Sequence, residues 1–136
     1  MILMTELLKG KSIDDQSEEI KGNLINLLVI INKIRTLWGK PMKVTSGLRS
    51  MEEHLAIYAS KKITDKSKIP MKSKHLYGQA VDIYDPNLEI TNWLKANPKI
   101  MEDCAIFCES GNSNWVHIQI TPFNSYVRGG SRWFNP

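Results

Sequence analysis

The sequence has few of the residues that cross-link or anchor a protein. It contains only two cysteines and no apolar run long enough to cross a membrane. Cys104 and Cys108 lie four positions apart in "CAIFCE", and on a strand their α-carbons would be roughly 13 Å apart, beyond the reach of a disulfide. We therefore expect two reduced, packed thiols, because no second cysteine pair is present to complete a metal site.

The first residues, "MILMTELLKGK", lack the basic start, long apolar run and small-residue cleavage site of a signal peptide. We expect a protein made in the cytoplasm, with no membrane partner. Internal repeats and linkers are also absent, and 136 residues with 42% hydrophobic content suit one domain, residues 1–136. The formal net charge of +4 favours anionic surroundings, such as a bacterial cell wall or a phosphate-rich polymer, without identifying one.

Three segments have the spacing and end signals of helices. The segment from about residue 17 to Gly39 begins with "SEE" and carries apolar residues at helical intervals. Ser50 and Glu53 form a capping-box pattern that predicts a helix to about residue 60. "DP" at residues 85–86 predicts the start of a third helix, which ends before the proline of "NPK".

Short β-branched and alternating runs predict the strands. "MKVTSG" and "AVDIY" read as two of them, and "CAIFCES" and "WVHIQI" flank the turn-forming "GNSN" as a hairpin. A turn centred on Gly111 and Asn112 would place residue 109 opposite residue 114. Together these elements predict an α+β domain with a small, mainly antiparallel sheet and about three helices.

Two basic segments allow more than one interpretation. The segment 61–74 holds six lysines and is expected to be an exposed loop, which is either simply solvated or touches an anionic substrate. The tail after Pro122 either lines a groove or packs over the sheet, and we favour packing. Its aromatic and basic residues are Phe123, Tyr126, Arg128, Arg132, Trp133 and Phe134.

A histidine and an aspartate in "KHLYGQAVDIY" indicate a metal site. His75 and Asp82 flank a glycine and an alanine that let the backbone come close, and His117 on the last strand can supply a third ligand. Two histidines and one carboxylate leave one tetrahedral position open, as in catalytic zinc sites. Taken singly, however, each of these residues is more often a hydrogen-bonded core or surface residue.

Three motifs in order resemble a known family. "SGLRS", "SKHLYGQAVD" and "WVHIQ" are similar to the signatures of the D-alanyl-D-alanine carboxypeptidase family of zinc peptidases, which includes phage L-alanyl-D-glutamate endopeptidases and has a hedgehog-like fold. The resemblance implies that zinc is the cofactor and that His75, Asp82 and His117 are its ligands. It also implies that Arg49 holds a substrate carbonyl or carboxylate and that Ser73 is a polar neighbour of the metal.

The sequence departs from the family pattern at the general base. Many relatives carry a glutamate three residues before the last histidine, and Asn114 stands there, which cannot accept a proton. Glu109 is the carboxylate of the predicted hairpin, and some relatives carry a glutamate at the end of the preceding strand. We therefore expect Glu109 to be the base, with a surface hairpin residue as the alternative. Trp115, two residues before His117, either walls the site or packs in the core.

Two other motifs are excluded by their spacing. "EEHLAIY" lacks a second histidine four residues after His54, where Tyr58 stands, so we expect His54 on a helix surface. "GKSID" lacks the earlier glycine of a phosphate loop, because position 5 is Thr5. Neither a nucleotide site nor a nucleic-acid partner is expected.

The resemblance implies a hydrolase of peptidoglycan stem peptides, either an endopeptidase or a D-alanyl-D-alanine carboxypeptidase, and we expect a monomer. Without a signal peptide or anchor, such a domain suits a phage lysis or virion enzyme that reaches the cell wall by another route. Two alternatives stay open. One is a zinc-binding, wall-recognising or structural virion module without peptidase activity, which Asn114 favours, and the other is a scaffold domain that binds no metal.

Overall fold

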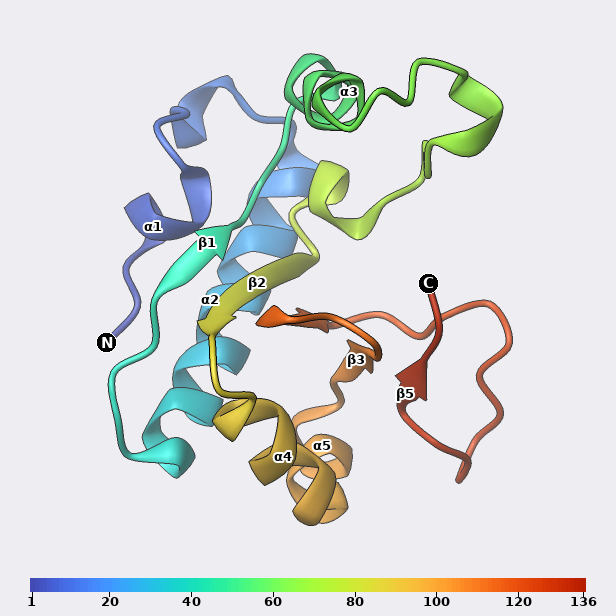
Figure 1. Cartoon of the computed structure of the whole chain (residues 1–136). Helices are drawn as coiled ribbons and strands as arrows, with labels where there is room; N and C mark the ends of the chain where they lie inside the picture. Colours follow the sequence, from blue (N-terminus) through green and yellow to red (C-terminus); the bar gives the residue numbers. More distant parts are fainter.

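The computed structural model describes residues 1–136 and has the predicted α+β fold, with the long helix 18–38 lying behind the central strands of a five-stranded sheet (Figure 1). The helices are α1 (Met4–Leu8), α2 (Glu18–Trp38), α3 (Met51–Ser60), α4 (Glu89–Ala96) and α5 (Pro98–Cys104), and the 3-10 turns are η1 (Ile13–Asp15), η2 (Lys66–Lys68) and η3 (Lys74–Tyr77). None of the helices combines the length and apolar character that a membrane crossing requires.

The sheet is mixed, in the order β1-β2-β4-β3-β5. Its strands are β1 (Val44–Ser46), β2 (Ala80–Asp85), β3 (Phe107–Glu109), β4 (Asn114–Gln119) and β5 (Trp133–Phe134). Neighbouring strands are antiparallel except for β3 and β5, which are parallel. The longest pairing joins β2 to β4 at the centre of the sheet, so these two strands have the most fixed backbone positions.

Helix α2 forms the core with one face of β2 and β4. Its ends are those that the sequence predicts, with the Ser17 hydroxyl accepting from the Ile20 amide and Gly39 in the left-handed conformation. The fully buried residues on the two sides of this contact are Leu24, Leu27, Ile31 and Ile34 on α2 and Val81, Ile83, Val116 and Ile118 on the strands. Each such burial stabilises the fold by about 1.5–3 kcal/mol. Helix α2 thus covers one face of the two central strands, and polar side chains of β2 and β4 project from the other face.

The helix count exceeds the prediction of about three, because α1 and α5 have only five and seven residues and show no clear periodicity. Pro98, which should follow the end of a helix, also begins α5, since proline suits the first helical position. Helix α4 begins at Glu89 rather than at residue 86. Asp85 nevertheless caps it, because its carboxylate accepts from the Ile90 and Thr91 amides at 3.0 and 2.9 Å.

The predicted position of His54 is wrong. This side chain is fully buried, and its Nε2 lies 2.9 Å from the Pro70 carbonyl oxygen. The lysine-rich segment 61–74 is largely exposed, as predicted, but it covers the His54 face of α3 and buries Ile69. The burial of His54 therefore depends on the position of a loop, which the helical periodicity of the sequence does not predict.

The late hairpin forms, but the predicted register is wrong. Glu109 lies opposite His117, whereas Asn114 lies opposite Asp85 on β2. Both Gly111 and Asn114 have positive φ, at 85° and 71°, so the chain turns more widely than a two-residue hairpin. Residues 114–116 then pair only with β2, because β3 has already ended at Glu109.

Candidate metal centre

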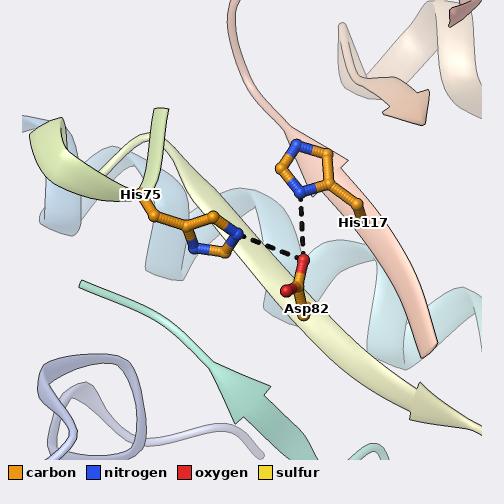
Figure 2. Close-up of side chains that lie close together, drawn as sticks. All are labelled: His75, Asp82 and His117. Atoms are coloured by element: carbon orange, nitrogen blue, oxygen red, sulfur yellow. Dashed lines mark hydrogen bonds and ion pairs between the residues drawn. The ribbon is translucent and has the colours of Figure 1, made fainter. Parts of the chain in front are cut away.

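Three side chains meet on the face of the sheet opposite α2 (Figure 2). His75 comes from η3, and Asp82 and His117 are direct partners on β2 and β4. His75 Nε2 and His117 Nδ1 lie 3.2 and 3.0 Å from the same Asp82 Oδ1 oxygen. All three residues are buried, and their ligand atoms lie within 4.8 Å of one another. The structure therefore brings together the three residues that the sequence predicts as ligands.

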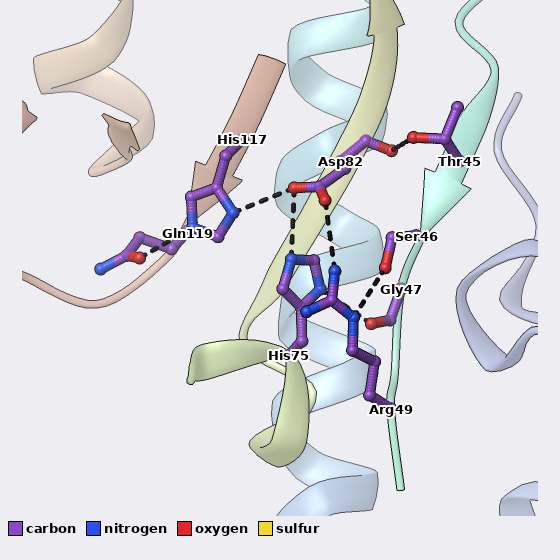
Figure 3. Close-up of polar contacts among 8 residues, drawn as sticks. All are labelled: Thr45, Ser46, Gly47, Arg49, His75, Asp82, His117 and Gln119. Carbon is purple, nitrogen blue, oxygen red and sulfur yellow. Dashed lines mark hydrogen bonds and ion pairs between the residues drawn. The ribbon is translucent and has the colours of Figure 1, made fainter. Parts of the chain in front are cut away.

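The outer nitrogen of each imidazole is also held. His75 Nδ1 lies 2.9 Å from the Gly47 carbonyl oxygen, and His117 Nε2 lies 2.9 Å from Gln119 Oε1 (Figure 3). Both partners accept hydrogen bonds, so each ring donates its N–H outward and can turn a lone pair inward. Two such nitrogens and a carboxylate are a donor set that suits zinc. The residues of this site therefore fit the metal that the resemblance implies.

Gly47 can hold His75 because it lacks a side chain. A Cβ at this position would collide with the Leu7 carbonyl, and the next residue, Leu48, donates its amide to that carbonyl at 2.8 Å. The close approach of α1 to β1 therefore requires glycine. This close approach fixes the position of the Gly47 carbonyl, which orients the His75 ring.

Burial and hydrogen bonding act against each other in this cluster. Burial would raise the pKa of Asp82, but hydrogen bonds from His117 and His75 outweigh it and hold that pKa well below the usual range. Burial lowers the pKa of His75, which favours the neutral ring that a metal needs. Burial also disfavours a charged His117, yet its hydrogen bond to Asp82 raises its pKa. The carboxylate is therefore ionised, and a proton competes with the metal mainly at His117.

Arg49 lies against the same carboxylate, on the side away from His117 (Figure 3). Its Nε donates to Ser46 Oγ at 3.1 Å, and its Nη2 lies 3.6 Å from Asp82 Oδ2. Its backbone amide donates to the His75 carbonyl at 3.0 Å. A guanidinium held in this way is a preset donor beside the metal ligands.

The other predicted residues lie around the centre. Ser73 is half-buried and immediately precedes η3, which carries His75. Trp115 is half-buried on β4, and because strand side chains alternate it shares the face of His117.

Glu109 and His117 are cross-strand partners, so they project from the same face of the sheet. The half-buried Glu109 carboxylate forms no ion pair or hydrogen bond, and its charge is one of the influences that raise the pKa of His117. Asn114 is exposed at the other end of β4.

Two residues of this region, Gln119 and Tyr58, are not predicted from the sequence. Gln119 orients His117. The only feature of the sequence that indicates this contact is that Gln119 follows His117 by two residues and so shares its face of the strand. The Tyr58 ring packs at a tilt of 60° against His54, with ring centroids 5.1 Å apart. Burial raises the pKa of Tyr58, and the charges of Arg49 and Glu109 act on it in opposite directions. Its position four residues after His54 places both on one helix face.

The family model described as Peptidase M15 matches residues 3–119 of this chain. The match includes the three clustered ligands, Arg49 and Glu109, and it ends before the tail 120–136. No curated protein and no solved structure matches the chain.

Proposed function

The chain belongs to the peptidase M15 family of zinc-dependent metallopeptidases, and from that premise we propose that it hydrolyses peptide bonds in peptidoglycan stem peptides. The observation that carries the proposal is the cluster of His75, Asp82 and His117, whose two imidazoles are oriented from outside the cluster. Zinc is the cofactor, and when bound by these residues it supplies a Lewis acid that activates water and polarises a carbonyl.

Glu109 is the proposed general base and acid. It accepts a proton from the attacking water as the C–O bond forms, and it delivers a proton to the amine nitrogen as the C–N bond breaks. Two observations support this role. Glu109 lies opposite the ligand His117, and its carboxylate has no other partner that would hold it away from substrate.

Arg49 is the proposed substrate cation. Its guanidinium is held by Ser46 and faces the ligand carboxylate, so it can donate to a substrate carbonyl or carboxylate oxygen without reorganisation. Ser73 and Trp115 are proposed to contact the substrate at the edges of the centre.

The proposal covers two cleavage positions in the stem peptide. An endopeptidase would cut within the stem, and a carboxypeptidase would release a terminal D-alanine. Digestion of purified peptidoglycan followed by mass spectrometry separates the two activities. An endopeptidase frees a new amino terminus within the stem peptide, whereas a carboxypeptidase releases free D-alanine. We propose that the protein acts as a monomer on the cell wall, as a phage-type lysin.

Asn114 favours a second candidate, a zinc-binding wall-recognition or structural virion module that does not cleave. An amide stands where many relatives have the base, and Asn114 lies opposite Asp85 rather than Glu109. Binding of peptidoglycan by the zinc-loaded protein, with no chelator-sensitive release of peptides or D-alanine, would support this module and contradict the peptidase.

The decisive variant is Glu109→Gln, which keeps the shape of the side chain but cannot accept a proton. We expect hydrolysis of purified peptidoglycan to fall by about a hundredfold or more, with zinc content unchanged. Glu52→Gln, an equal change at an exposed position of α3, is the matched control and should hydrolyse at the unmodified rate. Equal rates for the two variants would exclude Glu109 as the base.

A further inference from the structure

A second cavity, of about 660 Å³, lies between the helices α4 and α5 and the tail segment 126–133. Most of the residues that define it are charged or aromatic: Lys95, Glu102, Tyr126, Arg128, Arg132 and Trp133. The tail residues that line this cavity lie beyond residue 119, where the family match ends. The tail thus both packs, as predicted, and lines a groove, which was the other interpretation of its sequence.

The cavity lies at the β5 edge of the sheet and contains none of the three clustered residues His75, Asp82 and His117. On β5, Trp133 lies beside Cys108, which belongs to the buried core on the helix side. The next residue, Phe134, lies beside Glu109, and its ring centroid is 6.1 Å from that of the ligand His117. Consecutive residues of one short strand therefore wall two separate sites.

The cavity has an excess of positive charge that no protein group neutralises. Lys95, Arg128 and Arg132 line it together with one carboxylate, Glu102, which leaves two net positive charges. None of these four side chains takes part in an ion pair. Three unpaired cations around a concave surface attract an anionic ligand.

Two of the three cations, Arg132 and Lys95, are also held in place before any ligand binds. The Arg132 guanidinium carbon lies 4.7 Å from the Phe107 ring centroid and 5.4 Å from that of Tyr126, and its Nη1 reaches the Ile106 carbonyl at 3.4 Å. Stacking of this kind fixes the guanidinium and leaves other N–H groups free for a ligand.

Arg128 stands at the corner of a tight turn. The Gly130 amide donates to the Val127 carbonyl at 2.8 Å, and Gly129 has a φ of 82°, which requires glycine. Lys95 Nζ lies 5.1 Å from the centroid of the Trp133 ring. Lys95 and Arg132 are thus each held against an aromatic ring, and the turn fixes the backbone position of the exposed Arg128.

We propose that this cavity binds consecutive phosphate groups of a polyol-phosphate polymer. Its volume exceeds that of a single ion, and its two net positive charges match two neighbouring phosphodiesters. Lys95 and Arg132 already cover the Trp133 and Tyr126 rings, which leaves little aromatic surface for stacking on a nucleic-acid base or a sugar. The inference stands apart from the proposed hydrolysis, because the cavity contains none of the metal-centre residues.

The test uses the zinc-loaded full chain and a short poly(glycerol phosphate) oligomer as the probe, with affinity measured by calorimetry at low and physiological salt. Lys95→Gln combined with Arg128→Gln should weaken binding by about tenfold or more, because two charge-assisted contacts are lost. Glu102→Gln should strengthen binding, since it removes the one opposing charge. Hydrolysis of a soluble stem peptide should be the same in all of these variants.

The matched control is Lys66→Gln combined with Lys68→Gln, which removes the same charge from the exposed loop 61–74. An equal loss of affinity in this control would overturn the assignment, because general surface charge would then explain binding. Equal or tighter binding of single-stranded DNA or of a polyglutamate of the same charge would also overturn it. A protein that binds the oligomer but cleaves no peptide would contradict the proposed peptidase and leave the cavity assignment supported.

Discussion

Replacement of Gln119 by leucine tests whether the outer contact of His117 sets the affinity for zinc. Leucine is similar in size but cannot accept the His117 Nε2 hydrogen, and both residues are buried, at 4% and 7% exposure. Leaving a buried donor without a partner costs about 1–3 kcal/mol. The ring can avoid this cost by moving its proton to Nδ1, the nitrogen that faces Asp82. In that tautomer His117 has no inward lone pair.

We therefore expect Gln119→Leu to weaken zinc binding by about 10–100-fold. Competition with a chromophoric chelator measures this directly, and a thermal melt of the metal-free protein separates loss of affinity from loss of folding. The control is Gln79→Leu, because Gln79 is half-buried near the start of β2 and its side chain makes no hydrogen bond in the structure. Zinc affinities within twofold of each other in the two variants would refute the argument that Gln119 fixes the tautomer.

Three further outcomes are expected. His117→Ala should lose zinc by elemental analysis, and metal removal from the unmodified protein should lower its melting temperature, because the ligands join β2 to β4; full occupancy in the variant would contradict the ligand assignment. Arg49→Ala should keep zinc and its melting temperature within a few degrees yet lose most hydrolysis, and Arg49→Lys should not restore it fully, because a point charge cannot replace a planar two-pronged donor. Cys104 and Cys108 are free and buried, and burial raises the pKa of both thiols, so a thiol reagent should label neither in the native protein and both after unfolding.

Local signals in the sequence predict much of this fold, because they depend on neighbouring residues alone. The Ser17 cap, the Gly39 stop and the Ser50–Glu53 capping box are all present as predicted. The ligand set is also predicted, but it depends on family motifs, since His75 and His117 meet only through tertiary structure. The spacing alone does not distinguish a metal-binding histidine from a hydrogen-bonded core or surface histidine.

The wrong predictions share a physical cause, because each depends on contacts between distant segments. The register of β3 is set by the extension of β4 along β2, which no turn motif encodes. His54 is buried by a lysine-rich loop whose composition indicates exposure. The cavity depends on α5, a helix too short for periodicity, and on the position of Arg132 between two rings. Local chemistry cannot predict such contacts.

The pairing of Asp82 with His117 has a consequence for when the proposed ligands could take up zinc. These ligands are 35 residues apart in the chain and become neighbours only when β2 and β4 align. In a zinc finger, by contrast, the ligands lie close together in a short segment, and the metal organises the fold around itself. Here a growing chain on the ribosome holds at most two of the three ligands until residue 117 has been added. With these three residues as the proposed ligands, we expect zinc to be captured by a sheet that has already assembled, as a late event in the biogenesis of the protein.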